Sequence, residues 1–195
     1  MEKTKSIMIV GVGGQGSLLA SRLLGNILLG AGYDVKVSEV HGMSQRGGSV
    51  VTYVKYGDKV YSPVVNEGEA DIVISFELCE AARALPYLKR DGKLIVNTQQ
   101  IDPMPVITGA AEYPQDIVAK LQAAGADVFA FDALTLAEQA GSAKATNVVL
   151  IGAMSNILPF SEEEWDRVIE TTVPPKFLQL NKTAFALGRS HSQLR

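Results

Sequence analysis

Apolar residues near the start of the chain change their spacing, and this change predicts a strand followed by a helix. Residues 6–10 form a short, largely β-branched run that ends at a glycine, as is typical of a buried strand. Leucine and isoleucine then recur at helical spacing over 17–31, and Gly30 and Gly32 are residues at which such a helix can end. Residues 33–39 are predicted to form a second strand parallel to the first, which would complete a βαβ unit.

The pattern changes after residue 40. Segment 41–48 contains three glycines and shows no apolar period, so we expect a loop there. Residues 49–56 alternate in the manner of a strand, and Gly57-Asp58 could turn the chain back into 59–63. We therefore expect an antiparallel hairpin, over about 49–63, inserted into a mostly parallel sheet.

Strands and helices are predicted to alternate through the rest of the chain. Asp132 is placed to cap one helix, and Ser161 with Glu164 forms a capping box for another. The expected strands are 71–76, 93–97 and 127–131, and the proline-rich crossing over 98–115 leaves room for a further short strand at 104–107. The expected helices are 77–88, 114–124, 134–140, 146–158, 161–171 and 176–187, followed by a frayed tail from Gly188.

Together these elements predict a protein of the α/β class. We expect a Rossmann-like, mostly parallel sheet with helices on both faces, the inserted hairpin and a set of C-terminal helices. The 195 residues suit a single domain spanning 1–195, since the sequence shows no internal repeat and no linker-like tract.

Charge and cysteine content narrow the classes of function. The 18 basic and 21 acidic residues give a net charge of −3, and no basic run indicates binding to nucleic acid. The lone cysteine, Cys79, excludes an internal disulfide framework and a four-thiolate iron–sulfur cluster held by this chain alone. The single thiol, the lack of a signal-peptide pattern and the lack of a membrane-length apolar run lead us to expect a cytoplasmic protein without membrane segments.

A glycine-rich turn is expected between the first strand and the first helix. Glycines permit positive φ and close approach to the backbone, and a helix start behind them presents free N–H groups to a phosphate or carboxylate. A dinucleotide site would also need an acidic residue at the end of the second strand, where Glu39 lies, so a free-standing NAD(P)- or nucleotide-binding protein is one alternative. A turn that only shapes the fold is another. The turn is Gly11-Val12-Gly13-Gly14-Gln15-Gly16.

A second glycine-rich element, His41-Gly42-Met43-Ser44-Gln45-Arg46-Gly47-Gly48-Ser49, follows the second predicted strand. It should lie beside the first at the carboxyl edge of the sheet. A cation, an amide, a hydroxyl and freed backbone N–H groups suit a phosphate, a carboxylate or a partner's backbone. These groups come from Arg46, Gln45, Ser44, Gly47 and Gly48. Since the element has no cysteine, carboxylate pair or nucleophile–base pair, we expect a binding or docking loop with neither catalytic residues nor a metal site.

With a third motif, Lys144-Ala145-Thr146-Asn147 leading into Leu150-Ile151-Gly152-Ala153, the resemblance to a known family becomes specific. In the order and spacing of these motifs, the chain resembles the gamma-type subunits of 2-oxoacid:ferredoxin oxidoreductases, and within them the indolepyruvate branch. The resemblance covers nearly the whole chain.

The resemblance implies a chain that acts only within a complex. Such enzymes oxidatively decarboxylate a 2-oxoacid with thiamine diphosphate, pass electrons through iron–sulfur clusters to ferredoxin, and yield an acyl-coenzyme A. The sequence has no Gly-Asp-Gly thiamine motif and no cluster cysteines, so both cofactors are expected on a large partner subunit. This chain would complete the active site or bind coenzyme A through the two glycine elements, with Arg46 on the anion. A homodimer within the hetero-oligomer stays open.

Overall fold

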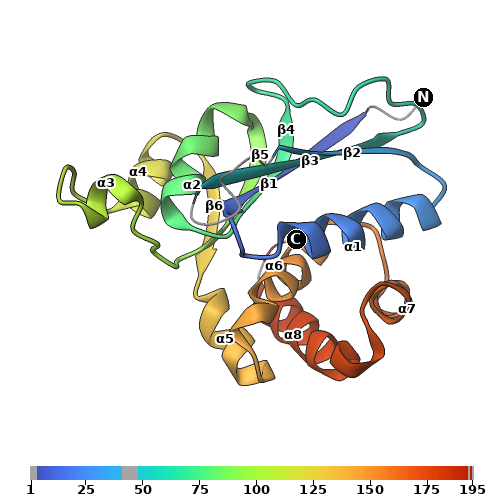
Figure 1. The fold of residues 1–195 in the computed structure, drawn as a ribbon. Coiled ribbons are helices and arrows are strands. Elements are labelled where there is room, and N and C mark those ends of the chain that lie inside the picture. The colour runs from blue at the N-terminus through green and yellow to red at the C-terminus, as the bar shows by residue number, and fades with distance from the viewer. Residues whose placement is uncertain (1–3, 41–47, 193, 195) are drawn as a thin grey trace.

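Six strands form one sheet within the part of the chain that the structure, a computed structural model, describes: residues 4–40, 48–192 and 194 (Figure 1). The strand order is β2-β3-β1-β4-β5-β6. β1, β4, β5 and β6 are parallel to their neighbours in this series, whereas β3 is antiparallel to both β1 and β2. The predicted α/β class is confirmed. The strands span Lys5–Val12 (β1), Asp34–Val40 (β2), Ser49–Gly57 (β3), Ala70–Ser75 (β4), Leu88–Asn97 (β5) and Asp127–Phe131 (β6).

β3 occupies a place that differs from the prediction. It pairs along its length with β1, from Lys5↔Tyr56 to Val12↔Ser49, and its other edge pairs with β2. A hairpin that returns through 59–63 is therefore wrong, because both edges of β3 are already paired and residues 58–69, all of them described, contain no strand. The antiparallel insertion is present, but β2 and β1 are its partners. For the same reason β2 runs in the direction of β1 without touching it.

Helices cover both faces of the sheet, as predicted (Figure 1). Alternate residues of β1 point to opposite faces, so Ile7 and Ile9 belong to one hydrophobic core while Met8 and Val10 belong to the other. The first core joins the sheet to α1, α5, α6, α7 and α8, and the second joins it to α2 and α4. The helices span Ser17–Gly30 (α1), Leu78–Ala84 (α2), Met104–Ile107 (α3), Ile117–Ala123 (α4), Ala133–Ala140 (α5), Thr146–Ser155 (α6), Glu162–Thr172 (α7) and Leu178–His191 (α8).

α6 and α8 pack with their backbones in direct contact. A methyl group built on Gly188 would lie 1.9 Å from the Val149 carbonyl oxygen, and one on Gly152 would lie 2.2 Å from the Phe185 carbonyl oxygen. Only glycine permits this approach. The expectation of a frayed tail from Gly188 is wrong, because this packing continues α8 to His191.

Helix-start signals predicted from the sequence are confirmed. Asp132 accepts a hydrogen bond at the start of α5, and Ser161 with Glu164 forms the capping box of α7. Both signals depend on residues three positions apart or fewer, so local sequence is enough to predict them.

Residues 104–107 form the short helix α3 instead of the short strand that the sequence allowed. Pro103 precedes this helix and Pro105 lies in its first turn. Proline is accommodated at the start of a helix, whereas in a strand it cannot donate to the hydrogen-bond ladder. The prolines therefore explain why this segment does not extend the sheet.

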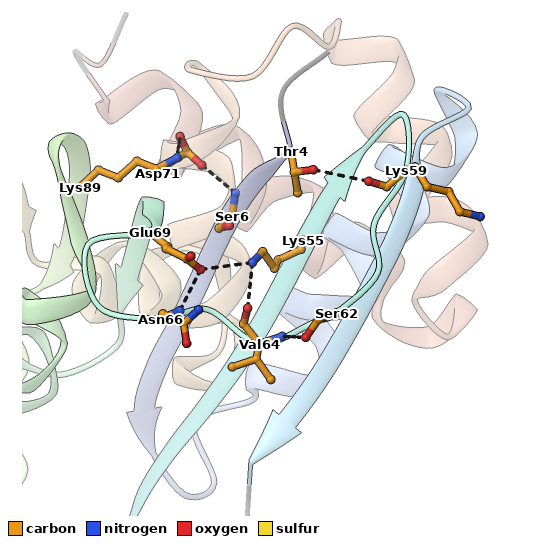
Figure 2. Close-up of polar contacts among 10 residues, drawn as sticks. All are labelled: Thr4, Ser6, Lys55, Lys59, Ser62, Val64, Asn66, Glu69, Asp71 and Lys89. Carbon is orange, nitrogen blue, oxygen red and sulfur yellow. Dashed lines mark hydrogen bonds and ion pairs between the residues drawn. The ribbon is translucent and has the colours of Figure 1, made fainter. Parts of the chain in front are cut away.

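The amino-terminal edge of the sheet is held together by its own polar groups (Figure 2). The Lys55 ammonium donates to the Val64 carbonyl oxygen at 2.8 Å and lies 3.3 Å from the Glu69 carboxylate, which ties the 58–69 connection to β3. The Asp71 carboxylate accepts from the Ser6 backbone N–H at 2.7 Å and from the Lys89 ammonium at 2.5 Å. The polar groups at this edge of the sheet are therefore paired with one another.

Candidate functional site

The first glycine element forms the predicted turn at the carboxyl end of β1. Gly14 and Gly16 have positive φ angles, of 100° and 85°, and the Gln15 backbone N–H donates to the Val12 carbonyl oxygen at 3.2 Å. Gly16 is the N-cap of α1, and no side chain caps the helix there. The turn thus delivers the chain from strand to helix and leaves the helix start without a side-chain partner, as an anion-binding turn requires.

Gln15 folds back onto the turn. Its Oε1 accepts from the Val12 backbone N–H at 2.7 Å, and its Nε2 donates to the Phe76 carbonyl oxygen at 3.0 Å and to Gln99 Oε1 at 3.3 Å. These contacts tie the end of β1 to the ends of β4 and β5. The Gln15 amide therefore shapes the turn from inside.

Asn97, which sequence analysis missed, completes this amide network. It is fully buried at the end of β5, and its Nδ2 donates to the Phe76 carbonyl oxygen at 3.1 Å and to Gln99 Oε1 at 3.3 Å. Its Oδ1 accepts from the Ala133 backbone N–H at 3.1 Å. The carboxyl ends of four parallel strands are thereby fastened together. An asparagine as the last residue of a buried apolar strand is the sequence signal that could have pointed to it.

The third motif is brought against the glycine turn by the fold. Asn147, in the first turn of α6, is buried and donates from Nδ2 to the Gly16 carbonyl oxygen at 2.9 Å. A methyl group built on Gly16 would lie 2.5 Å from that Nδ2. Two features therefore favour glycine at position 16: its positive φ and the Asn147 amide packed against it.

A cavity of about 500 Å³ opens over the turn. Backbone of the glycine turn, two side-chain amides, a hydroxyl and one exposed ammonium group line it, with a few apolar atoms. Such a lining, with a helix start and a cation but no carboxylate, favours an anionic group. The lining residues are Gly14, Gln15, Gly16, Gln99, Leu134, Ala143, Lys144 and Thr146.

The described end of the second glycine element, Gly48 and Ser49, contacts the first element. The Gly13 backbone N–H donates to the Gly48 carbonyl oxygen at 2.9 Å, and Ser49 pairs with Val12 at the start of β3. Ser44, Gln45, Arg46 and Gly47 lie outside the described residues. The described ends of that segment, Val40 and Gly48, both lie at the carboxyl edge of the sheet.

A second cavity, of about 240 Å³, adjoins Gly48 and contains polar groups that sequence analysis did not single out. Glu77 is fully buried, and its carboxylate accepts from the backbone N–H groups of Glu80 at 3.0 Å and Ile101 at 3.1 Å and from the Tyr113 hydroxyl. Burial and the bond to Glu77 raise the pKa of the Tyr113 phenol above its ordinary range. The phenol therefore stays protonated and acts as a donor.

The neighbouring Glu80 carboxylate is also buried and paired. It accepts from the Ser49 hydroxyl at 2.5 Å and from the Arg83 guanidinium at 2.8 Å. Burial raises the pKa of the Cys79 thiol, which lines the same cavity. A thiol held in its protonated form is a poor nucleophile, so this cluster supplies structure and offers no nucleophilic centre.

Glu39 does not take the place of the ribose-binding acid in a dinucleotide site. β3 lies between β2 and β1, which puts Glu39 two strand spacings, roughly 10 Å, from β1. Its carboxylate accepts from the Ser21 hydroxyl of α1 at 3.0 Å. The arrangement gives no support to the nucleotide-binding alternative.

The described residues form neither a metal site of the usual ligands nor a membrane-spanning helix. No group of three or more histidine, cysteine or carboxylate side chains among these residues is arranged to hold a metal ion. No helix in the same ranges is long and apolar enough to cross a bilayer.

Comparison with known proteins identifies relatives along nearly the whole chain. Residues 6–191 match the family described as pyruvate ferredoxin/flavodoxin oxidoreductase. The indolepyruvate oxidoreductase subunit IorB of Thermococcus kodakarensis is 49% identical over 191 residues, which cover 95% of each chain.

Solved structures with the same fold come from the same group of enzymes. The gamma subunit of a keto/oxoacid ferredoxin oxidoreductase from Geobacter sulfurreducens has a TM-score of 0.71 at 23% identity, covering 95% of this chain and 96% of that one. The 2-oxoglutarate:ferredoxin oxidoreductase of Magnetococcus marinus, solved with 2-oxoglutarate, coenzyme A and succinyl-CoA bound, has a TM-score of 0.72 at 20% identity, and the match covers 97% of this chain but 31% of that longer one.

These findings confirm the resemblance that the three sequence motifs indicated. The family match and the half-identical relative both extend across the glycine turn, the segment after β2 and the start of α6. The chain belongs to the pyruvate ferredoxin/flavodoxin oxidoreductase family.

Proposed function

We propose that this chain is the subunit of an indolepyruvate:ferredoxin oxidoreductase that does not bind thiamine diphosphate. The complex would oxidatively decarboxylate an aryl pyruvate in the cytoplasm, pass the electrons to ferredoxin and release the acyl group on coenzyme A. The observation that carries this proposal is the 49% identity, over 95% of both chains, to a protein named as an indolepyruvate oxidoreductase subunit.

In this proposal the redox cofactors belong to a large partner subunit. A four-thiolate iron–sulfur cluster needs more cysteines than Cys79 alone, and burial keeps that thiol protonated. Thiamine diphosphate and the clusters would therefore lie on the partner, and ferredoxin would be reduced through the complex. Two copies of this chain within the hetero-oligomer are compatible with the proposal.

The part assigned to this chain is to bind an anionic group, with the phosphates of coenzyme A as the candidate. Three observations support it: the cavity over the turn, the start of α1 without a side-chain cap, and the Gly13–Gly48 hydrogen bond that joins the two elements. Arg46 would supply the fixed cation. The proposed binding residues are Gly11, Gly13, Gly14, Gln15, Gly16, Ser44, Gln45, Arg46, Gly47 and Gly48, with Gln15 acting by shaping the turn.

Reconstitution tests the proposed activity. The chain is co-expressed with the thiamine-bearing large subunit, and reduction of ferredoxin is followed with indolepyruvate and coenzyme A as substrates. Each subunit alone serves as a control, and pyruvate and 2-oxoglutarate replace indolepyruvate in parallel assays. We expect activity only in the complex and a preference for the aryl pyruvate. A complex that prefers another 2-oxoacid, or a large subunit fully active alone, would contradict the proposal.

The same complex tests the binding role through Arg46→Ala. Loss of a charge-assisted hydrogen bond costs about 1.5–3 kcal/mol, so the affinity for coenzyme A measured by titration calorimetry should fall by roughly tenfold or more. Arg90→Ala removes an exposed arginine at the opposite edge of the sheet and is the matched control. Equal affinities of the two variants would refute the role of Arg46 and leave the reaction itself unaffected.

A further inference from the structure

Residues 101–113 form an arm that leaves the sheet after β5 and returns before α4. The arm contains α3 and projects away from the body of the molecule (Figure 1). Its backbone is internally bonded: the N–H groups of Ala110 and Ala111 donate to the Pro105 carbonyl oxygen at 2.8 and 3.0 Å, and that of Thr108 donates to Met104 at 2.9 Å. The arm is therefore a shaped protrusion with a defined backbone.

The middle of the arm is uncharged and is flanked by two exposed carboxylates, Asp102 and Glu112. Residues 103–111, Pro-Met-Pro-Val-Ile-Thr-Gly-Ala-Ala, contain no charge, although charged residues make up 20% of the chain. Met104 and Ile107 are each 65% exposed, which places them among the most exposed large hydrophobic side chains described. Depletion of charge around exposed apolar side chains is the composition of the centre of a protein interface.

Both ends of the arm are fastened by one buried carboxylate. Glu77 Oε1 accepts from the Ile101 backbone N–H at 3.1 Å, where the arm begins, and from the Tyr113 hydroxyl, where it ends. The Tyr113 hydroxyl in turn accepts from the Cys79 backbone N–H at 3.2 Å. Burying a carboxylate is costly unless every oxygen is paired. Here the pairing sets the position of an exposed loop, which pre-organises the arm for a partner.

The base of the arm adjoins the proposed ligand site. Ile101, Pro103 and Met104 line the same 240 Å³ cavity as Val12 and Gly48, which belong to the two glycine elements. A partner that covers this cavity would therefore contact the base of the arm as well as the glycine elements. Met104 belongs to this base, and Ile107 lies one helical turn further along the arm in α3.

We infer that the 101–113 arm docks into the partner subunit that carries thiamine diphosphate, with Met104 and Ile107 as apolar anchors in a nonpolar depression of that subunit. The inference rests on the proposed function, because the identity of the partner subunit comes from that proposal. The arm brings this partner to the glycine elements, and the Glu77 carboxylate holds the arm in the orientation that docking needs.

Binding of the purified full-length chain to the large subunit tests the inference. Met104→Asp/Ile107→Asp places two carboxylates at the proposed anchors. Leu29→Asp/Tyr61→Asp, the matched control, charges two residues that are 57% and 91% exposed near the opposite edge of the sheet. Affinity is measured by titration calorimetry, and thermal unfolding of each variant alone checks that it folds. Loss of interface anchors commonly reduces affinity by roughly tenfold or more.

The expected result is a weakened complex for the arm variant, normal affinity for the control, and unfolding temperatures equal to that of the unaltered chain. Recombining the weakened variant at high concentration should restore indolepyruvate oxidation. An arm variant that binds as tightly as the control would overturn the docking inference and leave the proposed function in place. If the unaltered chain itself does not bind the large subunit, both proposals are overturned.

Discussion

Substitution of Gly16 by alanine should destabilise the protein far more than the same substitution two residues earlier. Both Gly14 and Gly16 have positive φ, so alanine at either position costs about 1–2 kcal/mol in backbone strain. At Gly14 nothing lies within 4 Å of the added methyl group, whereas at Gly16 the methyl carbon would lie 2.5 Å from Asn147 Nδ2. The amide must move, and its 2.9 Å hydrogen bond to the Gly16 carbonyl oxygen is lost.

The magnitude follows from these contacts. A buried amide left without its partner costs about 1–3 kcal/mol, which adds to the backbone strain and gives roughly 2–5 kcal/mol for Gly16→Ala. Gly14→Ala should cost only the strain. Since a domain is stable by about 5–15 kcal/mol, the Gly16 variant would lose a large share of its stability.

Urea unfolding followed by the fluorescence of the buried Trp165 measures both variants, with equal m-values as the check that the unfolded states are comparable. The same pair is then made in an Asn147→Ala background, where the steric contact is absent. There, Gly16→Ala should cost no more than Gly14→Ala. The reasoning is refuted if the two variants are equally stable in the natural background, or if the extra cost persists without Asn147.

Two further predictions concern groups away from the glycine turn. Tyr113→Phe should cost about 1–3 kcal/mol near neutral pH, because the Glu77 carboxylate loses a donor. The folded state raises the pKa of this phenol above its ordinary value of 10.0. The difference in free energy of unfolding between the natural protein and Tyr113→Phe, measured with denaturant, should therefore be full below pH 10.0 and decline above it. A difference that grows as the pH rises would contradict this. Lys55→Met should cost about 1 kcal/mol and speed proteolytic cleavage within 58–69, because a side chain that is 15% exposed loses its bond to Val64. Lys59→Met, at a residue 62% exposed, is the control for stability and should leave the free energy of unfolding unchanged.

Local elements were predictable because their signals are short. The strand, glycine turn and helix at residues 5–30, the Asp132 cap and the Ser161 capping box each depend on neighbours within a few positions. The helix predicted over 146–158 and observed over 146–155 followed from its mostly apolar composition, although that composition does not say which helix packs on it.

The position of β3 could not be read from its alternating pattern. A period of two predicts a strand and its buried face, but any neighbour with a matching face can pair with it. The arrangement of the complete sheet determines that β3 pairs with β1 and β2 and not with residues 59–63. The connection through α1 places β2 one strand position away from β1, and β3 occupies the position between them.

Some features of the candidate site likewise follow from the sequence, whereas others depend on the tertiary structure. The sequence by itself determined that glycines shape a turn at a strand end, since glycine adopts positive φ angles without the strain that other residues incur, and it indicated the family through three motifs. Only the tertiary structure decided what surrounds the turn. Asn147 reaches Gly16 across 131 positions, and Glu77 reaches Tyr113 across 36. Such contacts arise from packing of the complete fold, because side chains distant in sequence satisfy buried polar groups only after the sheet has brought them together.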